Sequence, residues 1–335
     1  MKKINFKFVF GAVCIMVFGN VFAQDPITQP QGNYGLTSIL DGAPPAPGFY
    51  LMEYGSYYSG TLKDNNGNDV TTPLGNIKVN SLLLLNQGVW ITNKKILGGQ
   101  FLLDVLVPLV HLGIPNYEDA PDLLGKNTIL GDVTLGVGVQ WFNKKLFGLP
   151  YFHRLELDFI LPTGGYDKAF PVNVGSGFFS FQPYYAQTLF FSKSTSLSLR
   201  HHLTFNSKVD RTLDPTLPDV ELQAGSYYHV NYSLETLIGK RRFKPGESGE
   251  TRLAVQGYYG TQFGEDQING VDAANSKEKI FAVGPALHLI TKKGLALTFK
   301  TAFELGAENR TEGIRSTIRL VKFFPPKPKK KLNKI

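Results

Sequence analysis

The chain contains almost no cysteine and no apolar stretch long enough to cross a membrane as a helix. Its single cysteine, Cys14, lies within residues 8–18, an apolar stretch of eleven residues. A membrane-spanning helix needs about 20 such residues, so this stretch is too short to be one. If the chain is cleaved after it, the mature protein has no thiol. Disulfide bonds and thiolate catalysis are then excluded.

The first residues have the pattern of an export signal. Lys2, Lys3 and Lys7 precede the apolar stretch, and the short sequence 21–23, which ends on Ala23, follows it. A basic start, an apolar centre and a small-residue site are what signal peptidase recognises. We expect residues 1–23 to be a signal peptide that is removed before Gln24.

A charge excess is also missing from the body of the chain. The net charge is +8, but residues 1–23 carry three lysines and residues 325–335 carry five, with no acid in either stretch. The residues between are therefore neutral as a whole. This excludes the broad basic surface of a nucleic-acid-binding protein. We expect residues 325–335 to form a basic disordered tail, and no nucleic-acid partner.

The chain is rich in alternating apolar and polar residues. Val133, Leu135, Val137 and Val139, for example, are separated by polar or small residues, and this period of two is typical of a strand with one apolar face. Runs of this kind are longer than the five or six residues usual in globular strands. Twelve strands are expected, at residues 48–60, 76–91, 100–112, 129–142, 151–162, 178–191, 196–206, 220–238, 251–264, 280–291, 295–308 and 314–324.

The connections between these runs alternate between two kinds. Long ones are rich in Gly, Asn, Asp and Pro, whereas short ones carry basic clusters that recur about every fifty residues, beginning with Lys94-Lys95 and Lys144-Lys145. Membrane barrels have short periplasmic turns and long extracellular loops. Residues 92–99 and 143–150 are accordingly expected to be periplasmic turns.

Together these patterns predict an all-β fold, a transmembrane antiparallel up-and-down β-barrel of about twelve strands that spans residues 48–324. Such barrels reside in the outer membrane of Gram-negative bacteria. Aromatic residues near the ends of the expected strands, among them Tyr50, Tyr54, Trp90, Trp141 and Tyr227, are expected at the level of the lipid headgroups.

Residues 24–47 fit neither strand nor helix, because they contain five prolines. We expect them to form a periplasmic N-terminal segment, or a plug that folds into or under the periplasmic mouth. Twelve strands lie between the roughly eight whose interior side chains can fill and the sixteen or so that hold an open channel. The lumen should therefore be narrow and partly obstructed.

Polar residues that alternate with the apolar face of each strand are the candidates for lining this lumen. Opposite charges among them are expected to pair, because unpaired charges in a narrow lumen are costly. The candidates are Asp132, Arg154, Glu156, Asp158, Arg200, His202, Glu221, His229 and Glu235.

Residues for catalysis or metal binding are not evident. The six histidines are scattered over five of the expected strands and have no metal-site spacing. His202 with Asn206, or His229 with Ser233, could be fitted to the Ser/His/Asn arrangement of barrel phospholipases. Such neighbours are also expected by chance on the polar face of a strand. We expect no catalytic residue, no metal and no cofactor, and hence no enzyme.

Two stretches resemble one outer-membrane family. The sequences LPTGGYDKAFPVNVGSGFFSFQPYYA at 161–186 and PGFYLMEYGSYYSGTLKDNNGN at 47–68 are similar to the family labelled "putative MetA-pathway of phenol degradation". The resemblance implies a barrel of about this size and a role in taking up aromatic or other hydrophobic compounds. It implies no catalytic residues.

The favoured function is an outer-membrane channel or transporter for small hydrophobic or aromatic compounds, by passive diffusion through a narrow, partly plugged lumen. A structural or adhesive barrel and an outer-membrane hydrolase stay open as alternatives. The expected partners are outer-membrane lipid, the barrel-insertion machinery and a small-molecule solute. The terminal Phe323-Phe324 resembles the signal that this machinery reads. The sequence does not determine the oligomeric state.

Overall fold

The computed structural model describes residue 29 and residues 33–72, 75–115, 129–170, 172–212, 216–238, 249–291 and 295–326. The expected signal peptide and nearly all of the expected basic tail lie outside these residues.

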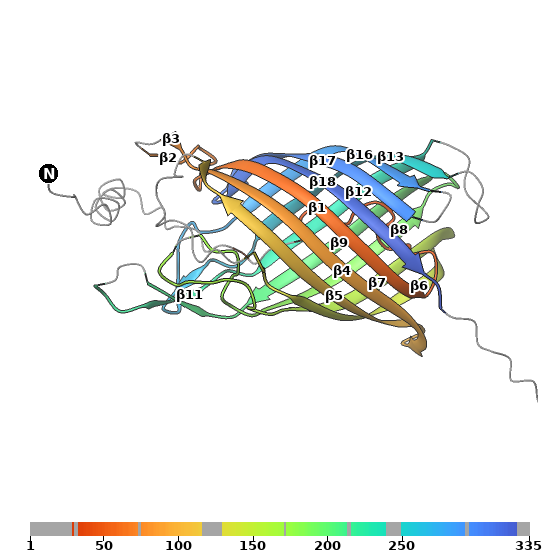
Figure 1. The fold of residues 1–335 in the computed structure, drawn as a ribbon, viewed down its shortest axis with the longest axis horizontal. Coiled ribbons are helices and arrows are strands. Elements are labelled where there is room, and N and C mark those ends of the chain that lie inside the picture. The colour runs from red at the N-terminus through yellow and green to blue at the C-terminus, as the bar shows by residue number, and fades with distance from the viewer. Residues whose placement is uncertain are drawn as a thin grey trace, which may run out of the picture.

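The described residues form a closed antiparallel barrel of twelve strands (Figure 1). This confirms the predicted fold class. Around the barrel the order is β1-β18-β17-β16-β13-β12-β9-β8-β7-β6-β5-β4. The strands are β1 (Gly48–Leu62), β4 (Lys78–Ile96), β5 (Gly99–Gly113), β6 (Thr134–Leu146), β7 (Leu149–Ile160), β8 (Ser180–Phe190), β9 (Thr195–Asn206), β12 (Tyr227–Leu237), β13 (Glu250–Gln262), β16 (Lys279–Ile290), β17 (Leu295–Glu308) and β18 (Thr311–Phe324).

The barrel closes between its first and last strands. Strands β1 and β18 pair without interruption from Phe49 opposite Phe324 to Leu62 opposite Thr311. No strand edge of the barrel is therefore left open, which is the condition for a sheet to exist in lipid, where no water can satisfy free backbone groups.

Two of the turns at one end are shorter than the sequence predicted. Strands β4 and β6 continue to Ile96 and Leu146, so residues 92–99 and 143–150 are mostly strand. The turns themselves are Leu97-Gly98 and Phe147-Gly148, whose φ angles are all positive. Two such residues form a type I′ turn, whose twist matches that of a hairpin. The lysine pairs 94–95 and 144–145 lie within strands, beside irregularities in their register.

The opposite end carries the long connections and two small sheets. One is the pair β2 (Thr71–Thr72) and β3 (Gly75–Asn76). The other joins β10 (Val209–Arg211), β11 (Val220–Gln223), β14 (Gln267–Ile268) and β15 (Val271–Asp272). By the rule that long loops face outward, this end is extracellular.

The expected strand at residues 220–238 is divided in two. Strand β11 belongs to the extracellular sheet and β12 belongs to the barrel, with Gly225 between them. A Cβ at Gly225 would lie 2.2 Å from the carbonyl oxygen of Gly264, so the two chains approach closely at this point. Alternation continues across the break, which explains why the sequence pattern did not reveal it.

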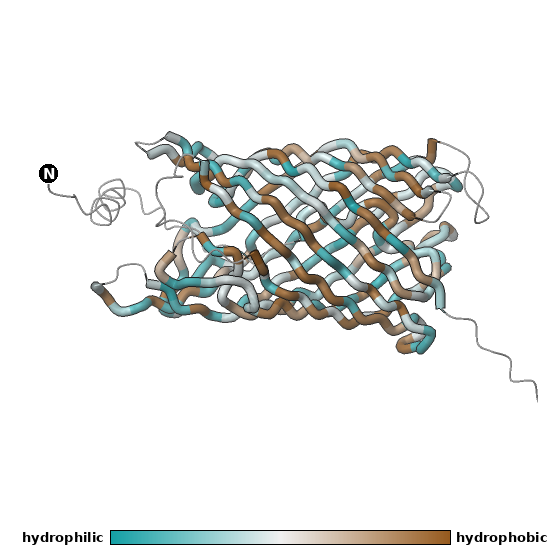
Figure 2. The backbone as a smooth tube through the Cα atoms, viewed as in Figure 1, coloured by the Kyte–Doolittle hydropathy of each residue, from teal (hydrophilic) through white to brown (hydrophobic). Residues whose placement is uncertain are grey.

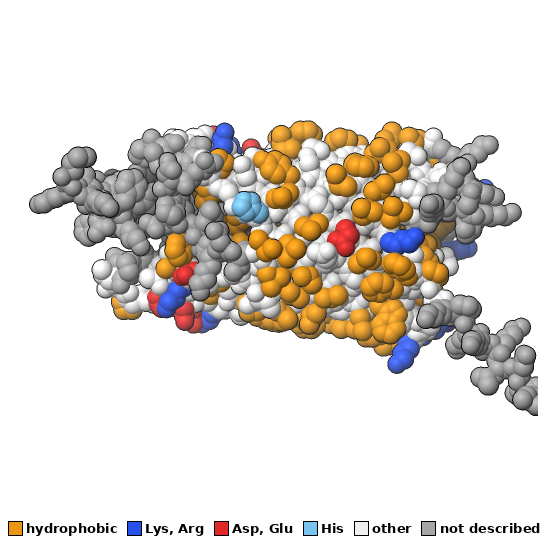
Figure 3. All heavy atoms as spheres, viewed as in Figure 1, with side chains coloured by type: hydrophobic (Ala, Val, Ile, Leu, Met, Phe, Trp, Pro, Cys, Tyr) orange, Lys and Arg blue, Asp and Glu red, His pale blue; other side chains and the backbone are white. Residues whose placement is uncertain are grey.

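The outward face of the barrel is an apolar belt (Figures 2 and 3). Leu135, Leu155 and Leu253 are among its exposed side chains. Glu53, which is half-buried on the outward face of β1, is an exception. An apolar belt around a closed barrel places the protein in an outer membrane. No helix among the described residues is both long and apolar enough to span a membrane.

Part of the aromatic prediction was wrong. Trp90 is exposed on the outside, but Tyr50, Tyr54 and Tyr227 are buried. Each of these tyrosines occupies an inward position in the alternation of its strand. Tyr50 and Tyr227 do lie near strand ends, whereas Tyr54 lies in the middle of β1. The face on which each of them lies depends on parity within the strand.

A charge placed on the apolar belt tests its contact with lipid. Leu155, in the middle of β7, is 42% exposed, and Phe147, at the tip of a turn, is 90% exposed. Leu155→Arg should destabilise the barrel by about 2–4 kcal/mol, the cost of arginine on a lipid-facing strand. Phe147→Arg, the matched control outside the belt, should be nearly neutral. Urea unfolding from phospholipid vesicles, followed by tryptophan fluorescence, measures both. Equal effects of the two substitutions would contradict the placement of the belt.

Candidate functional site

The barrel interior contains a stretch of the chain itself. Residues 33–47, here called the inner segment, precede β1 and run along the lumen (Figure 1). At the extracellular end, Gln29 donates from Nε2 to the carbonyl oxygen of Gly225 at 2.9 Å and accepts from Asn206 at 3.0 Å. At the periplasmic end, Ala46 is hydrogen-bonded to the hydroxyl of Tyr50. The chain therefore crosses the lumen from one mouth to the other.

An ion pair between Asp41 and Arg200 anchors the inner segment. Arg200 donates from Nε to Asp41 Oδ2 at 2.6 Å, and its Nη2 donates to Oδ1. Arg154 approaches the same carboxylate, with 3.9 Å between Nη2 and Oδ1. All three side chains are at most 6% exposed. Two-pronged arginine–carboxylate bonds are among the strongest polar contacts in proteins, especially when shielded from water.

Side chains of the barrel also satisfy the backbone of the inner segment. The amides of Gly35, Leu40 and Gly42 donate to Asn231 Oδ1, Glu235 Oε1 and Thr188 Oγ1, at 2.7, 3.1 and 3.0 Å. Carbonyl oxygens accept in turn from the barrel: that of Leu36 from Lys300 Nζ at 2.8 Å and that of Gly42 from Gln140 Nε2 at 2.9 Å.

These contacts follow from the lack of regular structure in the segment. Residues 33–47 form turns and bends with no paired strand, and they end in a stretch that contains Pro44, Pro45 and Pro47. Their buried backbone groups still require partners. The polar inward faces of the strands supply them. Each bond contributes only about 1 kcal/mol net, so the segment is held by many modest contacts and one strong one.

Apolar side chains of the inner segment pack on two parts of the wall. Leu36 joins a buried cluster on β1, β4 and β5 that includes Met52, Tyr54 and Leu85. Tyr34 lies 4.9 Å from the ring of His229, measured between ring centroids. Ile39 packs with Ala254 and Ala286 on β13 and β16. The lumen therefore has its largest apolar area toward β1, β4 and β5, and smaller apolar areas among β12, β13, β16 and β17.

The polar wall holds a stacked pair of histidines and several carboxylates. The rings of His202 and His229 are parallel, with centroids 4.1 Å apart. Glu156 lies 3.2 Å from Arg154 Nε and accepts from the Tyr184 hydroxyl. Glu235 accepts from Ser198 at 2.9 Å as well as from the inner segment. No group of three or more His, Cys, Asp or Glu within the described part of the chain could hold a metal ion.

Most of the sequence-predicted lumen residues lie on inward faces of barrel strands. They are Arg154, Glu156 and Asp158 on β7, Arg200 and His202 on β9, and His229 and Glu235 on β12, all of them buried.

Two predicted lumen residues lie elsewhere. Asp132 precedes β6 and accepts from the amides of Gly164 and Ser176 at 2.9 and 2.7 Å, so it joins two extracellular loops. Glu221 lies in β11, outside the barrel, and binds Lys208 at 2.6 Å. Its assignment to the lumen does not fit this position, because the alternation of residues 220–238 runs across two separate sheets.

Other lumen residues were missed. Asp41 lies in a segment with no periodicity, so nothing in the sequence marked it. Lys300 and Arg319 occupy inward positions of β17 and β18. Period-two alternation through Thr298, Lys300 and Ala302 could have indicated that Lys300 faces the lumen.

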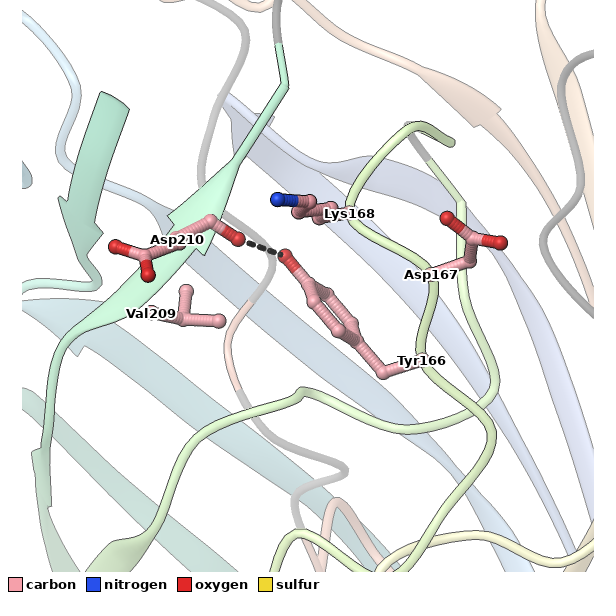
Figure 4. Close-up of a pocket in the computed structure, with 5 residues that line it drawn as sticks. All are labelled: Tyr166, Asp167, Lys168, Val209 and Asp210. Carbon is pink, nitrogen blue, oxygen red and sulfur yellow. Dashed lines mark hydrogen bonds between the residues drawn. The ribbon is translucent and has the colours of Figure 1, made fainter. Parts of the chain in front are cut away.

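A shallow depression of about 380 Å³ lies among the extracellular loops (Figure 4). Tyr166 crosses it and donates from its hydroxyl to the carbonyl oxygen of Asp210 at 3.0 Å. The neighbouring Lys168 pairs with Asp219. This hydrogen bond lowers the pKa of the Asp219 carboxyl and raises that of the lysine. The lysine of the depression is thus already paired, and the contacts of Tyr166 and Lys168 join two loops.

The anchoring role of Asp41 can be tested directly. Asp41→Asn leaves Arg200 and Arg154 without their shared carboxylate, and breaking a buried ion pair costs roughly 3–5 kcal/mol. We expect faster hydrogen–deuterium exchange at residues 33–46, with little change in the barrel strands. Asp69→Asn, which removes the exposed partner of Lys63, is the control. Unchanged exchange in Asp41→Asn would show that other contacts hold the segment.

Comparisons with known proteins agree with this architecture. Residues 59–320 match the family described as "Putative MetA-pathway of phenol degradation". Among solved structures, the COG4313 outer membrane channel from Pseudomonas putida F1 aligns over 89% of this chain and 100% of its own, with a TM-score of 0.69 and 16% identity. This likeness shows the fold. The monoaromatic hydrocarbon channel CymD aligns over 91% of this chain and 98% of its own, with a TM-score of 0.37 and 10% identity. No curated protein matches.

Proposed function

Because the chain belongs to the family described as "Putative MetA-pathway of phenol degradation", we propose that it is an outer-membrane channel for small hydrophobic or aromatic compounds. Solutes cross passively, and the inner segment is the plug that controls the opening. The predicted N-terminal plug corresponds to residues 33–47 in this proposal.

The observation that carries the proposal is that the lumen is filled by a segment that is not itself a strand of the barrel wall. All twelve strands pair with one another, so none depends on the inner segment for its backbone bonds. The segment can therefore leave without opening the sheet. A structural or adhesive barrel needs no such removable element.

An enzymatic function has less support. His202 stacks on His229, and the amide of Asn206 donates to Gln29 and to the carbonyl oxygens of Ala224 and Gly225. His229 and Ser233 are buried in the filled lumen. A lipid or peptide substrate would have to displace the inner segment to reach either pair. We therefore propose that the protein is not an enzyme.

The last strand suggests how the barrel is assembled. Strand β18 ends on Phe323-Phe324 and pairs with both β1 and β17. We propose that the barrel-insertion machinery reads this strand, although further residues follow it in the chain.

Removing the plug tests the channel directly. A variant that lacks residues 33–46 should conduct ions several-fold better than the intact chain in planar lipid bilayers, because the charged lumen fills with water. A liposome-swelling series with sugars, fatty acids and phenolics then ranks solutes by their permeation. Conductance equal to that of the intact chain would contradict the plug.

Arg200 should govern the charge preference of the opened lumen. In the variant without residues 33–46, Arg200 has lost Asp41 and faces the pore. Arg200→Met should shift the reversal potential in a salt gradient toward cation preference, because a fixed positive charge is removed. Lys279→Gln, at the outer rim where Lys279 pairs with Glu308, should shift it less. An unmoved potential would exclude Arg200 as a determinant of selectivity.

A further inference from the structure

Three cations of the lumen take part in no ion pair among the described residues: Lys300 on β17, and Arg315 and Arg319 on β18. The ion pairs of the barrel interior join Arg154 and Arg200 to Asp41, Arg154 to Glu156, Arg252 to Glu250 and Arg310 to Glu278. Arg315 has other contacts: its Nε donates to the Tyr258 hydroxyl at 3.4 Å, and its guanidinium carbon lies 4.6 Å from the ring centroid of Tyr58. Lys300 is 7% exposed, and Arg319 Nε is buried with no hydrogen-bond partner in the described structure.

Lys300 and Arg319 adjoin the largest apolar area of the lumen. The guanidinium carbon of Arg319 lies 5.6 Å from the ring centroid of Tyr54, and its Nη2 lies 3.6 Å from Met52 Sδ. Both Met52 and Tyr54 belong to the buried cluster that also contains Leu85. Positive charge and an apolar surface thus meet at the junction of β1, β17 and β18.

Leu36 of the inner segment fills this junction. Its side chain packs in the apolar cluster, and its carbonyl oxygen accepts from Lys300 Nζ at 2.8 Å. It therefore presents an apolar group and a hydrogen-bond acceptor together. A neutral carbonyl leaves the positive charges of Lys300 and Arg319 uncompensated, whereas a carboxylate would supply the missing negative charge.

No free space is left beside Leu36 among the residues that the structure describes. The crevice between Gly35 and the wall residues Tyr258, Lys300, Arg315 and Thr317 has no room for even one water molecule. Gly35 has a φ of +63°, and a Cβ there would lie 3.0 Å from the Tyr258 ring. The segment thus passes close to the wall. A molecule the size of a benzene ring can bind here only if Leu36 leaves its position.

We propose that the place occupied by Leu36 is a binding site for the carboxylate of a small aromatic acid. The carboxylate binds Lys300 and Arg319, and the ring packs against Met52, Tyr54 and Leu85. This rests on the proposed channel function and narrows its substrate class from hydrophobic compounds in general to aromatic acids.

Binding at this site also loosens the plug. The ligand and Leu36 compete for the same contacts, so a ligand that binds the vacated site shifts the equilibrium toward the released segment. The other arginines near the inner segment already have partners: Arg154 and Arg200 share Asp41, Arg310 pairs with Glu278, and Arg315 donates to the Tyr258 hydroxyl. The anion is therefore directed to Lys300 and Arg319.

Benzoate is the probe for this site, and its uncharged analogue benzyl alcohol is the matched ligand control. Calorimetric titration of the full chain in detergent should show benzoate binding that Lys300→Met and Arg319→Met each weaken about tenfold or more, the effect of losing one charge-assisted bond. Lys300→Arg should retain binding. Lys279→Gln, outside the lumen, should have no effect.

Leu36→Ala gives a test that does not depend on a loss of binding. It removes apolar contacts of the competing segment, so benzoate affinity should rise several-fold. The hydrogen exchange of residues 33–46 should increase on adding benzoate to the intact chain, and not on adding benzyl alcohol.

Either of two results would overturn the site: benzoate affinity equal in the intact chain, Lys300→Met and Arg319→Met, or no benzoate binding even to Leu36→Ala. Failure of the site is distinguishable from failure of the channel. If the variant without residues 33–46 conducts but benzoate does not bind, the channel stands and the site is wrong. If that variant does not conduct, the channel itself is wrong.

Discussion

The ion pair between Asp41 and Arg200 is the contact on which the organisation of the lumen depends. Arg200 and Arg154 project from neighbouring parts of the wall toward one carboxylate, which a segment outside the wall supplies. Without it, two guanidinium groups would lie in a confined space with Glu156 as their remaining acidic contact. Burying charges is costly unless they are paired. The wall alone therefore leaves Arg200 without an acidic partner, and the inner segment supplies one.

The same constraint explains the contrast between the two faces of each strand. Lipid outside requires apolar side chains, and a narrow lumen inside requires polar groups that satisfy one another. Small residues make room for them. A Cβ at Gly136, on the inward face of β6, would lie 2.5 Å from Glu156 Oε1 and 2.7 Å from Asp158 Oδ1. The glycine allows these carboxylates to occupy space that a larger residue would take.

The lumen has two possible states, one with the inner segment inside it and one with the segment released. The inner segment gains its hydrogen bonds, its apolar contacts and the Asp41 ion pair when it is inside, and its backbone gains conformational freedom and water when it leaves. A solute that matches only some of the contacts can shift this balance. A solute gains the most binding free energy from contacts with Lys300 and Arg319, because the inner segment leaves the charges of these two residues uncompensated.

The strands could be predicted from the sequence because each carries its own signal. Alternation marks a strand and its two faces locally, and so the twelve strands, their apolar exterior and inward residues such as Arg154, Glu156 and His202 followed from the pattern. Some residues lie elsewhere than the pattern predicted, because parity decides the face of a residue and because alternation can continue past the end of a strand. Tyr54 was assigned to the lipid surface by its position along the strand, and Glu221 to the lumen because the alternation continues past Gly225.

What the sequence by itself determined is the type of wall: a neutral, membrane-embedded barrel of about twelve strands with short turns at one end. Only the tertiary structure decided what fills it. Asp41 lies more than 100 residues before Arg154 and Arg200, in a proline-rich stretch whose backbone has no periodic partner. Its place is determined by charge balance across a closed lumen. That balance exists only once distant strands have come together, so no local pattern could reveal it.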